Sequence, residues 1–131
     1  MELTKNQEFA FASIASMSLI SFTNGEPTES ELEEIYIQIH ECERLQNDID
    51  FSLVALDECR ERLEINFQDG HDAILDDIRE LKLGHDESVE IMNMTLNVVK
   101  SNSEIPPEKM DTLSEICQAM NLYSDEFNFA I

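Results

Sequence analysis

The sequence has few residues that interrupt regular structure. Its 131 residues include only three Gly, three Pro and no Trp. Few turn-forming residues predict helices joined by short loops, and the alternating β-branched and aromatic runs that predict strands are absent. The longest apolar run, residues 9–22, is shorter than the roughly 20 residues that a transmembrane helix needs. We therefore expect an all-α protein with one domain over residues 1–131 and no direct membrane insertion.

Basic residues are also scarce. Against 29 Asp and Glu stand eight Lys and Arg, for a formal net charge of -21. Binding to phosphates requires Lys and Arg, so this balance argues against nucleic acid and against anionic membrane surfaces as ligands. An acidic surface instead favours cations and basic proteins as partners.

Cysteine usage and the N-terminal segment bear on the compartment. The three cysteines are an odd number without close spacing, so we expect no disulfide framework and a reducing compartment. The apolar run 9–22 has the length of a signal-peptide core, but Glu2 and Glu8 flank it and no small-residue cleavage site follows. The sequence favours a buried helix here and a cytoplasmic protein.

Apolar residues recur at helical spacing in six segments. We expect helices over residues 8–22, 29–46, 51–65, 72–82, 86–100 and 107–120, with one more helical turn over 124–127. Asp69 and Gly70 are expected to interrupt the pattern, and Gly84 to end the fourth helix. This predicts a compact bundle of six or seven helices.

The chain also resembles itself at an offset of 78 residues. Residues 24–30 (NGEPTES) align with residues 102–108 (NSEIPPE). Each segment follows an apolar helix and precedes an amphipathic one. The sequence therefore predicts two pseudo-repeated helical hairpins around one core, because a repeat of this length is too long for a solenoid unit.

The two loops of these hairpins start their second helices differently. Thr28 and Glu31 have the spacing of a capping box, in which each side chain binds the backbone amide of the other residue. The second loop has Pro106 and Lys109 at these positions, so it has no box, and Pro107 suits the first position of a helix. Glu31 thus has a structural role without any ligand.

Oxygen-rich loops can also bind hard cations such as calcium. An EF-hand fits poorly, because aligning its glycine and final glutamate with Gly25 and Glu31 places Ile20 and Phe22 at ligand positions. The first loop nevertheless offers oxygens at Asn24, Glu26, Glu29 and Glu31, and the second at Asn102, Glu104 and Glu108.

A small-residue-rich apolar helix, an acidic loop and an amphipathic helix, recurring near the C-terminus, resemble the TerB-like domains. This family is named for tellurite-resistance protein B and includes the N-terminal domain of a membrane-anchored J-domain chaperone. The resemblance covers nearly the whole chain, including residues 78–81 and 116–122. It implies a compact all-α bundle and a non-enzymatic cytoplasmic module of bacterial stress and tellurite responses, with acidic residues proposed to bind metal.

The resemblance also implies a candidate metal site for a divalent cation such as calcium. The positions that it carries over are Asn24, Glu26, Glu31, Asn102 and Glu104, and Glu108 of the oxygen-rich second loop completes the candidate site. The chain has Asn24 and Asn102 where the family has aspartates, and Lys109 at the last acidic position of the second loop. These changes remove three negative charges and weaken the binding of a cation by both loops.

No catalytic motif appears in the sequence. It has no nucleophile elbow, P-loop or zinc-ligand spacing, and we expect His71 and His85 to be surface or capping residues at helix starts. The resulting hypothesis is a non-catalytic TerB-like protein that acts as an acidic interaction module with a protein partner. The alternatives are a divalent-cation-binding protein that uses the two loops and an acidic decoy for a basic protein.

Overall fold

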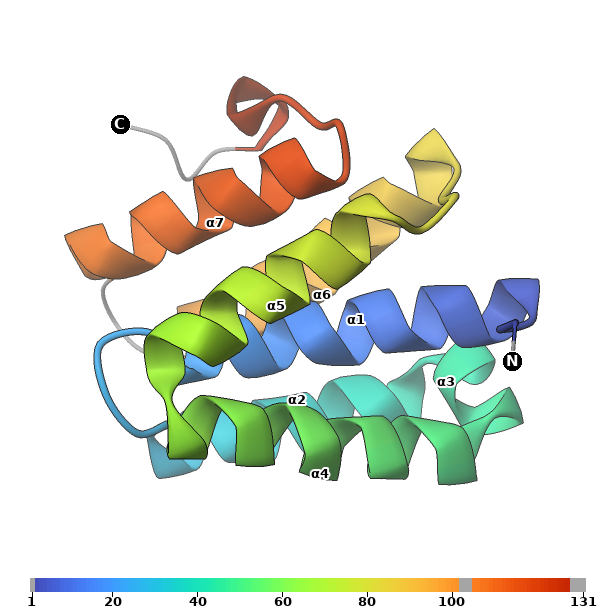
Figure 1. The fold of residues 1–131 in the computed structure, drawn as a ribbon, viewed down its shortest axis with the longest axis horizontal. Helices are drawn as coiled ribbons and strands as arrows, with labels where there is room; N and C mark the ends of the chain where they lie inside the picture. Colours follow the sequence, from blue (N-terminus) through green and yellow to red (C-terminus); the bar gives the residue numbers. More distant parts are fainter. Residues whose placement is uncertain (1, 102–104, 128–131) are drawn as a thin grey trace.

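A computed structural model describes residues 2–101 and 105–127 of the chain, and the regular structure in these residues is entirely helical. The helices are α1 (Lys5–Phe22), α2 (Glu29–Glu41), α3 (Glu43–Asn47), α4 (Ile49–Ile65), α5 (Phe67–Arg79), α6 (His85–Lys100) and α7 (Pro107–Ala119), and a 3-10 turn η1 (Ser124–Glu126) follows (Figure 1). The predicted all-α bundle is confirmed. No helix in the described residues has the length and apolar character to cross a membrane.

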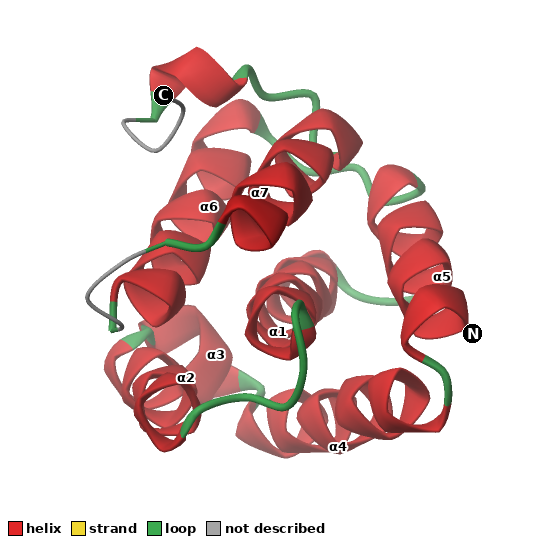
Figure 2. Cartoon of the chain, turned by 90° about the vertical axis from the view of Figure 1, so that its left-hand side faces the viewer, coloured by secondary structure: helices red, strands yellow, loops and turns green. Residues whose placement is uncertain are grey.

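Helix α1 forms the centre of the bundle. Viewed nearly along its axis, it is surrounded by the other helices (Figure 2), and it contacts each of them in the described structure. Every residue from Phe9 to Phe22 is buried except Phe11. A helix that is apolar on all sides requires neighbours on all sides, so the composition of this segment explains its position.

Four serines lie within this buried stretch of α1. The buried hydroxyls of Ser13 and Ser21 donate hydrogen bonds to the carbonyl oxygens of Phe9 and Ser18, both at 2.8 Å. Such bonds within the helix satisfy a hydroxyl that has no access to water. The hydroxyls of Ser13 and Ser21 are thus satisfied, whereas those of Ser16 and Ser18 are buried without a hydrogen-bond partner among the described residues.

The expected helix over residues 29–46 is wrong in one respect, because it is two helices. Cys42 has extended backbone angles (φ -93°, ψ 111°) and separates α2 from α3. The break lets α3 turn so that Leu45 is completely buried, while the guanidinium of Arg44 stacks 4.1 Å from the ring centroid of Phe9. Helical periodicity continues through the break, which hides it in the sequence.

The predicted boundaries around Gly70 and Gly84 are also wrong. Helix α5 begins at Phe67, because the side chain of Asn66 accepts a hydrogen bond from the Asp69 amide at 3.0 Å and caps the helix there. Gly70 lies inside α5. Gly84 does not end a helix but precedes α6, where its amide donates to the Glu87 carboxylate at 3.0 Å.

Gly70 lies at the closest approach of α5 to α4. A Cβ atom at this position would be 3.0 Å from the carbonyl oxygen of Arg62 and 3.1 Å from Cδ2 of Leu63. We expect Gly70→Ala to lower the free energy of unfolding by about 1–3 kcal/mol, because backbone crowding outweighs the gain of about 1 kcal/mol in helix propensity. Urea unfolding followed by circular dichroism measures this, and a stabilised variant would contradict the close packing.

The two expected hairpins correspond to α1–α2 and α6–α7. Their first helices pack extensively against each other, and α1 also contacts α7. At the end of α1, the Thr23 hydroxyl donates to the Leu19 carbonyl at 2.9 Å and lies 3.1 Å from the Thr112 hydroxyl of α7. The end of α1 therefore lies against α7 at this end of the bundle.

Candidate functional site

The first acidic loop reverses the chain through two residues with positive φ. Asn24 (φ 72°) and Gly25 (φ 113°) occupy this region, which Asn and Gly tolerate best. The predicted capping box then starts α2. The Thr28 hydroxyl accepts from the Glu31 amide at 3.1 Å, and the Glu31 Oε1 accepts from the Thr28 amide at 2.9 Å. The box is confirmed.

Lys109, in the first turn of α7, binds Oε2 of Glu31 through its ammonium group. Both side chains are buried, with exposed fractions of 7% for Lys109 and 1% for Glu31. These residues are the equivalent positions of the 78-residue offset. Each carboxylate oxygen of Glu31 thus has its own donor, one from a backbone amide and one from an internal cation.

The other residues of the candidate metal site have different positions. Glu26 and Asn24 are exposed and line a hollow of about 580 Å³ together with Glu64 and Phe67. Glu108 is exposed in the first turn of α7, and Asn102 and Glu104 lie outside the described residues. Among the residues described, no three His, Cys, Asp or Glu side chains are placed to hold one metal ion.

A calcium titration tests the cation hypothesis directly. We expect millimolar calcium to leave the melting temperature of the chelator-treated protein unchanged, because a calcium ion at Glu31 would have to displace the Lys109 ammonium. A ligand specific for the folded state would raise this temperature. A rise with calcium but not with magnesium, lost in Glu26→Gln, would contradict the expectation and establish a site in the first loop.

His71 differs from its predicted position at a helix start. It lies within α5, is buried, and bridges Asp72 and Glu115 of α7, with ring nitrogen to carboxylate distances of 2.9 and 3.0 Å. Burial alone would lower its pKa, but the hydrogen bonds and negative charges of the two carboxylates offset this and raise the pKa above 6.5. His85, by contrast, starts α6 and is exposed, as expected.

This bridge makes the stability dependent on pH. Because the pKa of His71 is higher in the folded state, its stabilising contribution is complete below about pH 6.5 and is lost as the pH rises through the folded pKa. We expect His71→Gln to flatten the decline of the free energy of unfolding above pH 6.5. The exposed His40 provides a control, since His40→Gln should retain the wild-type slope. An unchanged slope in His71→Gln would contradict the bridge.

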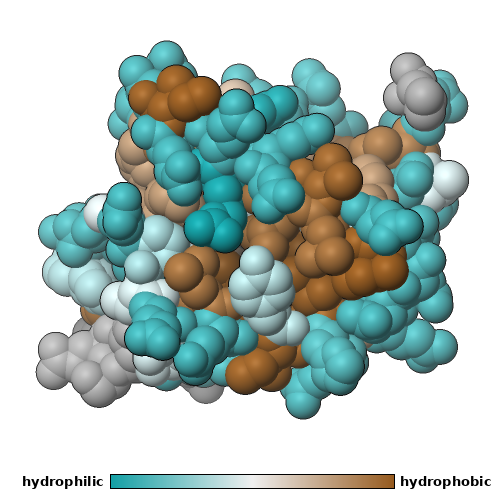
Figure 3. Space-filling model, turned by 90° about the horizontal axis from the view of Figure 1, so that it is seen from below, coloured by the Kyte–Doolittle hydropathy of each residue, from teal (hydrophilic) through white to brown (hydrophobic). Residues whose placement is uncertain are grey.

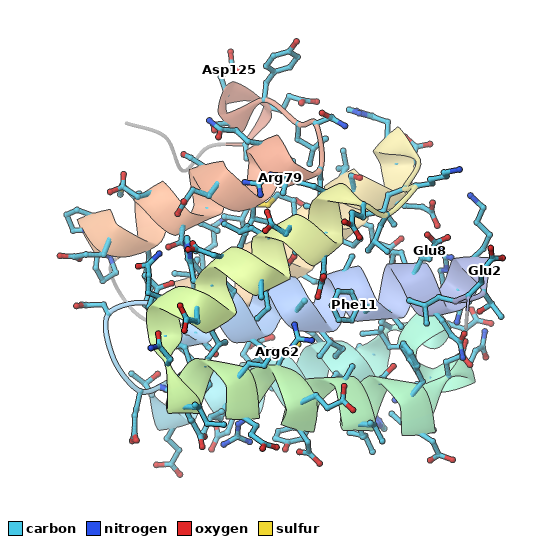
Figure 4. All side chains as sticks on the ribbon, viewed as in Figure 1. Glu2, Glu8, Phe11, Arg62, Arg79 and Asp125 are labelled. Atoms are coloured by element: carbon cyan, nitrogen blue, oxygen red, sulfur yellow. The ribbon has the colours of Figure 1, made fainter. Side chains whose placement is uncertain are left out.

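A second feature is a groove on the face opposite α2. Helices α4 and α5 meet at Asn66 and diverge from there, and part of α1 lies between them (Figure 1). Phe11, the one residue of the central run that is not buried, points into this opening, and Glu8 and Glu2 lie towards its wide end (Figure 4). The groove has a volume of about 720 Å³.

The lining of this groove, which we call the α4–α5 groove, is apolar at the floor and acidic at the rim. Its apolar residues are Leu3, Phe11, Phe51 and Leu81. Its charged residues are Glu2, Glu8, Glu58, Asp77, Glu80 and Lys82. Asp77 pairs with the exposed Arg62 at 3.1 Å, whereas Glu2, Glu58 and Glu80 pair with no basic side chain of the described structure. The groove therefore carries an excess of negative charge.

A third feature is an apolar surface on the lower side of the bundle. Seen from below, apolar side chains form a continuous area between polar ones (Figure 3). The exposed large hydrophobic residues of the helices on this side are Tyr36 and Ile37 on α2 and Leu53, Val54 and Ile65 on α4. Helices α2 and α4 hardly contact each other, which leaves these side chains uncovered. Leu53 is 39% exposed.

The sequence did not reveal the α4–α5 groove, because its residues come from α1, α4, α5 and the segments before α1 and after α5, which lie far apart in the chain. The sequence did, however, contain a signal for the buried pair of Glu31 and Lys109. The 78-residue alignment places a lysine opposite Glu31 in a chain with few lysines, and opposite charges at equivalent positions can meet where two repeats come together.

Comparison of the chain with protein-family models, with curated proteins and with solved structures found no match in any of the three. The proposed function therefore depends on the fold and on the features of the described residues, above all the α4–α5 groove.

Proposed function

We propose that this protein is a non-catalytic acidic interaction module that binds a basic protein partner. The single observation that carries the proposal is the α4–α5 groove, where exposed carboxylates without counter-ions surround an apolar floor. Charge complementarity of this kind increases association rates and selects partners of opposite charge. The TerB-like resemblance adds the expectation that the module acts in a bacterial stress or tellurite response in the cytoplasm.

The state of the cysteines supports a non-catalytic role. Burial raises the pKa of Cys59 to about 12 and that of Cys117 to about 11, so neither thiol is a thiolate at neutral pH. Cys42 is half-buried between α2 and α3, with its sulfur 3.9 Å from the carboxylate of Glu90. The two buried thiols, Cys59 and Cys117, are therefore not activated nucleophiles.

Binding of peptides of opposite charge tests the proposal. A fluorescent peptide of alternating lysine and glycine is expected to bind at low ionic strength and to dissociate as salt is added, because exposed charges are screened within about 10 Å at 0.1 M salt. A glutamate–glycine peptide of the same length is the control and is expected not to bind. Equal binding of both peptides, or no binding of either, would refute the proposed function.

A further inference from the structure

The α4–α5 groove is bounded by three helices and is open on its fourth side, where a further helix could pack. Its walls are two helices that diverge, and its floor is a third helix, α1 (Figure 1). Phe51 and Glu58 on α4 both line it, and seven helical residues correspond to roughly 10 Å of axis. The groove thus accompanies α4 for at least two turns. A helix placed there would pack against α1, α4 and α5 together, at the 8–10 Å spacing typical of helix pairs (about 10 Å with large side chains).

The floor supplies apolar contacts for such a helix. Phe11, Phe51 and Leu81 are each half-buried at the edge of the core, and Leu3 is 40% exposed. Two aromatic rings from different helices therefore form a fixed apolar surface. An extended peptide would lack backbone partners here, because the described structure has no strand edge, whereas binding of a helix in a groove needs only side-chain contacts.

The rim decides the charge of the occupant. Glu58 on α4 faces the groove from one wall, and Glu80, next to the end of α5, faces it from the other. Both are exposed, and the single lysine of the lining is Lys82. An acidic or neutral helix would leave these carboxylates without counter-ions, whereas lysine and arginine side chains on both flanks of the helix would pair with them.

We infer that the α4–α5 groove binds an amphipathic helix of a basic protein. The apolar face of this helix lies on Phe11 and Phe51, and its lysine and arginine side chains pair with Glu58 and Glu80. This inference rests on the proposed function and adds the binding surface and the secondary structure of the partner segment.

The experiment uses a leucine–lysine peptide of about 14 residues, roughly 21 Å as a helix, with leucines at helical spacing. A scrambled peptide of the same composition has the same charge but no apolar face. Binding of both to the full chain is measured by fluorescence anisotropy. We expect the patterned peptide to bind at least about tenfold more tightly than the scrambled one, because only its helix buries leucines on the groove floor.

Two matched double variants locate the binding surface. Glu58→Lys with Glu80→Lys reverses the rim of the groove, and Glu33→Lys with Glu41→Lys reverses two exposed carboxylates of α2 on the other side of α1. Both doubles change the net charge by the same amount, so long-range attraction falls equally. We expect the rim double to bind the patterned peptide at least about tenfold more weakly than the α2 double. Thermal unfolding of both doubles verifies that they are folded.

A third variant tests the floor without any change of charge. Phe11→Ala removes the ring at the centre of the groove and is expected to weaken binding of the patterned peptide by about tenfold, while binding of the scrambled peptide stays constant.

The outcomes separate the inference from the proposed function. Equal binding by the two doubles, or weaker binding by the α2 double, would overturn the groove as the site, and the second result would place the peptide on the lower apolar surface instead. Equal affinity for patterned and scrambled peptides would overturn the helical partner, with the acidic module still standing. No binding of any basic peptide would overturn both.

Discussion

Lys109→Met is expected to lower the free energy of unfolding by about 3–5 kcal/mol, because it leaves the Glu31 carboxylate buried without a counter-ion. Glu31 has an exposed fraction of 1% and would retain only the hydrogen bond from the Thr28 amide, at 2.9 Å. Water cannot replace the ammonium group without separating the first turn of α2 from the first turn of α7. Urea unfolding followed by circular dichroism measures the change.

Two comparisons distinguish a buried pair from general effects of charge. Lys100→Met removes an exposed lysine at the end of α6 and is expected to cost less than about 1 kcal/mol. Adding Glu31→Gln to Lys109→Met removes the uncompensated charge and keeps an oxygen for the Thr28 amide, so the double variant is expected to be more stable than Lys109→Met alone. A loss below about 1 kcal/mol in Lys109→Met would mean that water reaches the carboxylate.

Phe9→Ala is expected to have an effect of similar size, about 3–5 kcal/mol, because a large ring is removed from the centre of the bundle. Phe9 is completely buried, and its ring also supports the Arg44 guanidinium at 4.1 Å. The cavity cannot fill easily, because Phe9 lies on the helix that every other helix contacts. Denaturant unfolding measures the loss.

Phe11→Ala is the matched control for this variant. Both variants replace Phe by Ala on α1. The two positions are two residues apart, which places their side chains about 200° apart around the helix axis. Because Phe11 faces the α4–α5 groove and is half-buried, we expect a loss of about 1–2 kcal/mol. Equal losses in the two variants would contradict the orientation of α1 and the opening of the groove.

Whether a segment is helical and buried could be predicted from the local sequence more readily than the residues at which the helix begins and ends. The run from Phe9 to Phe22 is apolar on all sides, so burial follows from composition alone. Thr28 and Glu31 form a capping box because the interaction is local and its spacing is visible in the chain. The break at Cys42 was not predicted, because packing of α3 on Phe9 overrides the helical periodicity there. The start of α5 was predicted too late, because the local cap by Asn66 was not recognised.

Contacts between distant residues could not be predicted in this way. The sequence indicated acidic loops and a lysine at an acidic position of the second loop, but not that this lysine is buried against Glu31. It indicated a histidine beside an aspartate, but not that α7 brings Glu115 to the other ring nitrogen. In both cases the partner lies more than 40 residues away, and no local periodicity encodes such a distance.

The sequence by itself determined the helical class, the central buried helix, the capped start of α2 and the excess of negative charge, since each depends on composition or on residues a few positions apart. Only the tertiary structure decided where that charge matters. The divergence of α4 from α5 exposes Phe11 between carboxylates, and the approach of the first turns of α2 and α7 pairs Glu31 with Lys109. The physical reason is that helix crossing angles and loop contacts arise from packing of the whole core, which no single segment specifies.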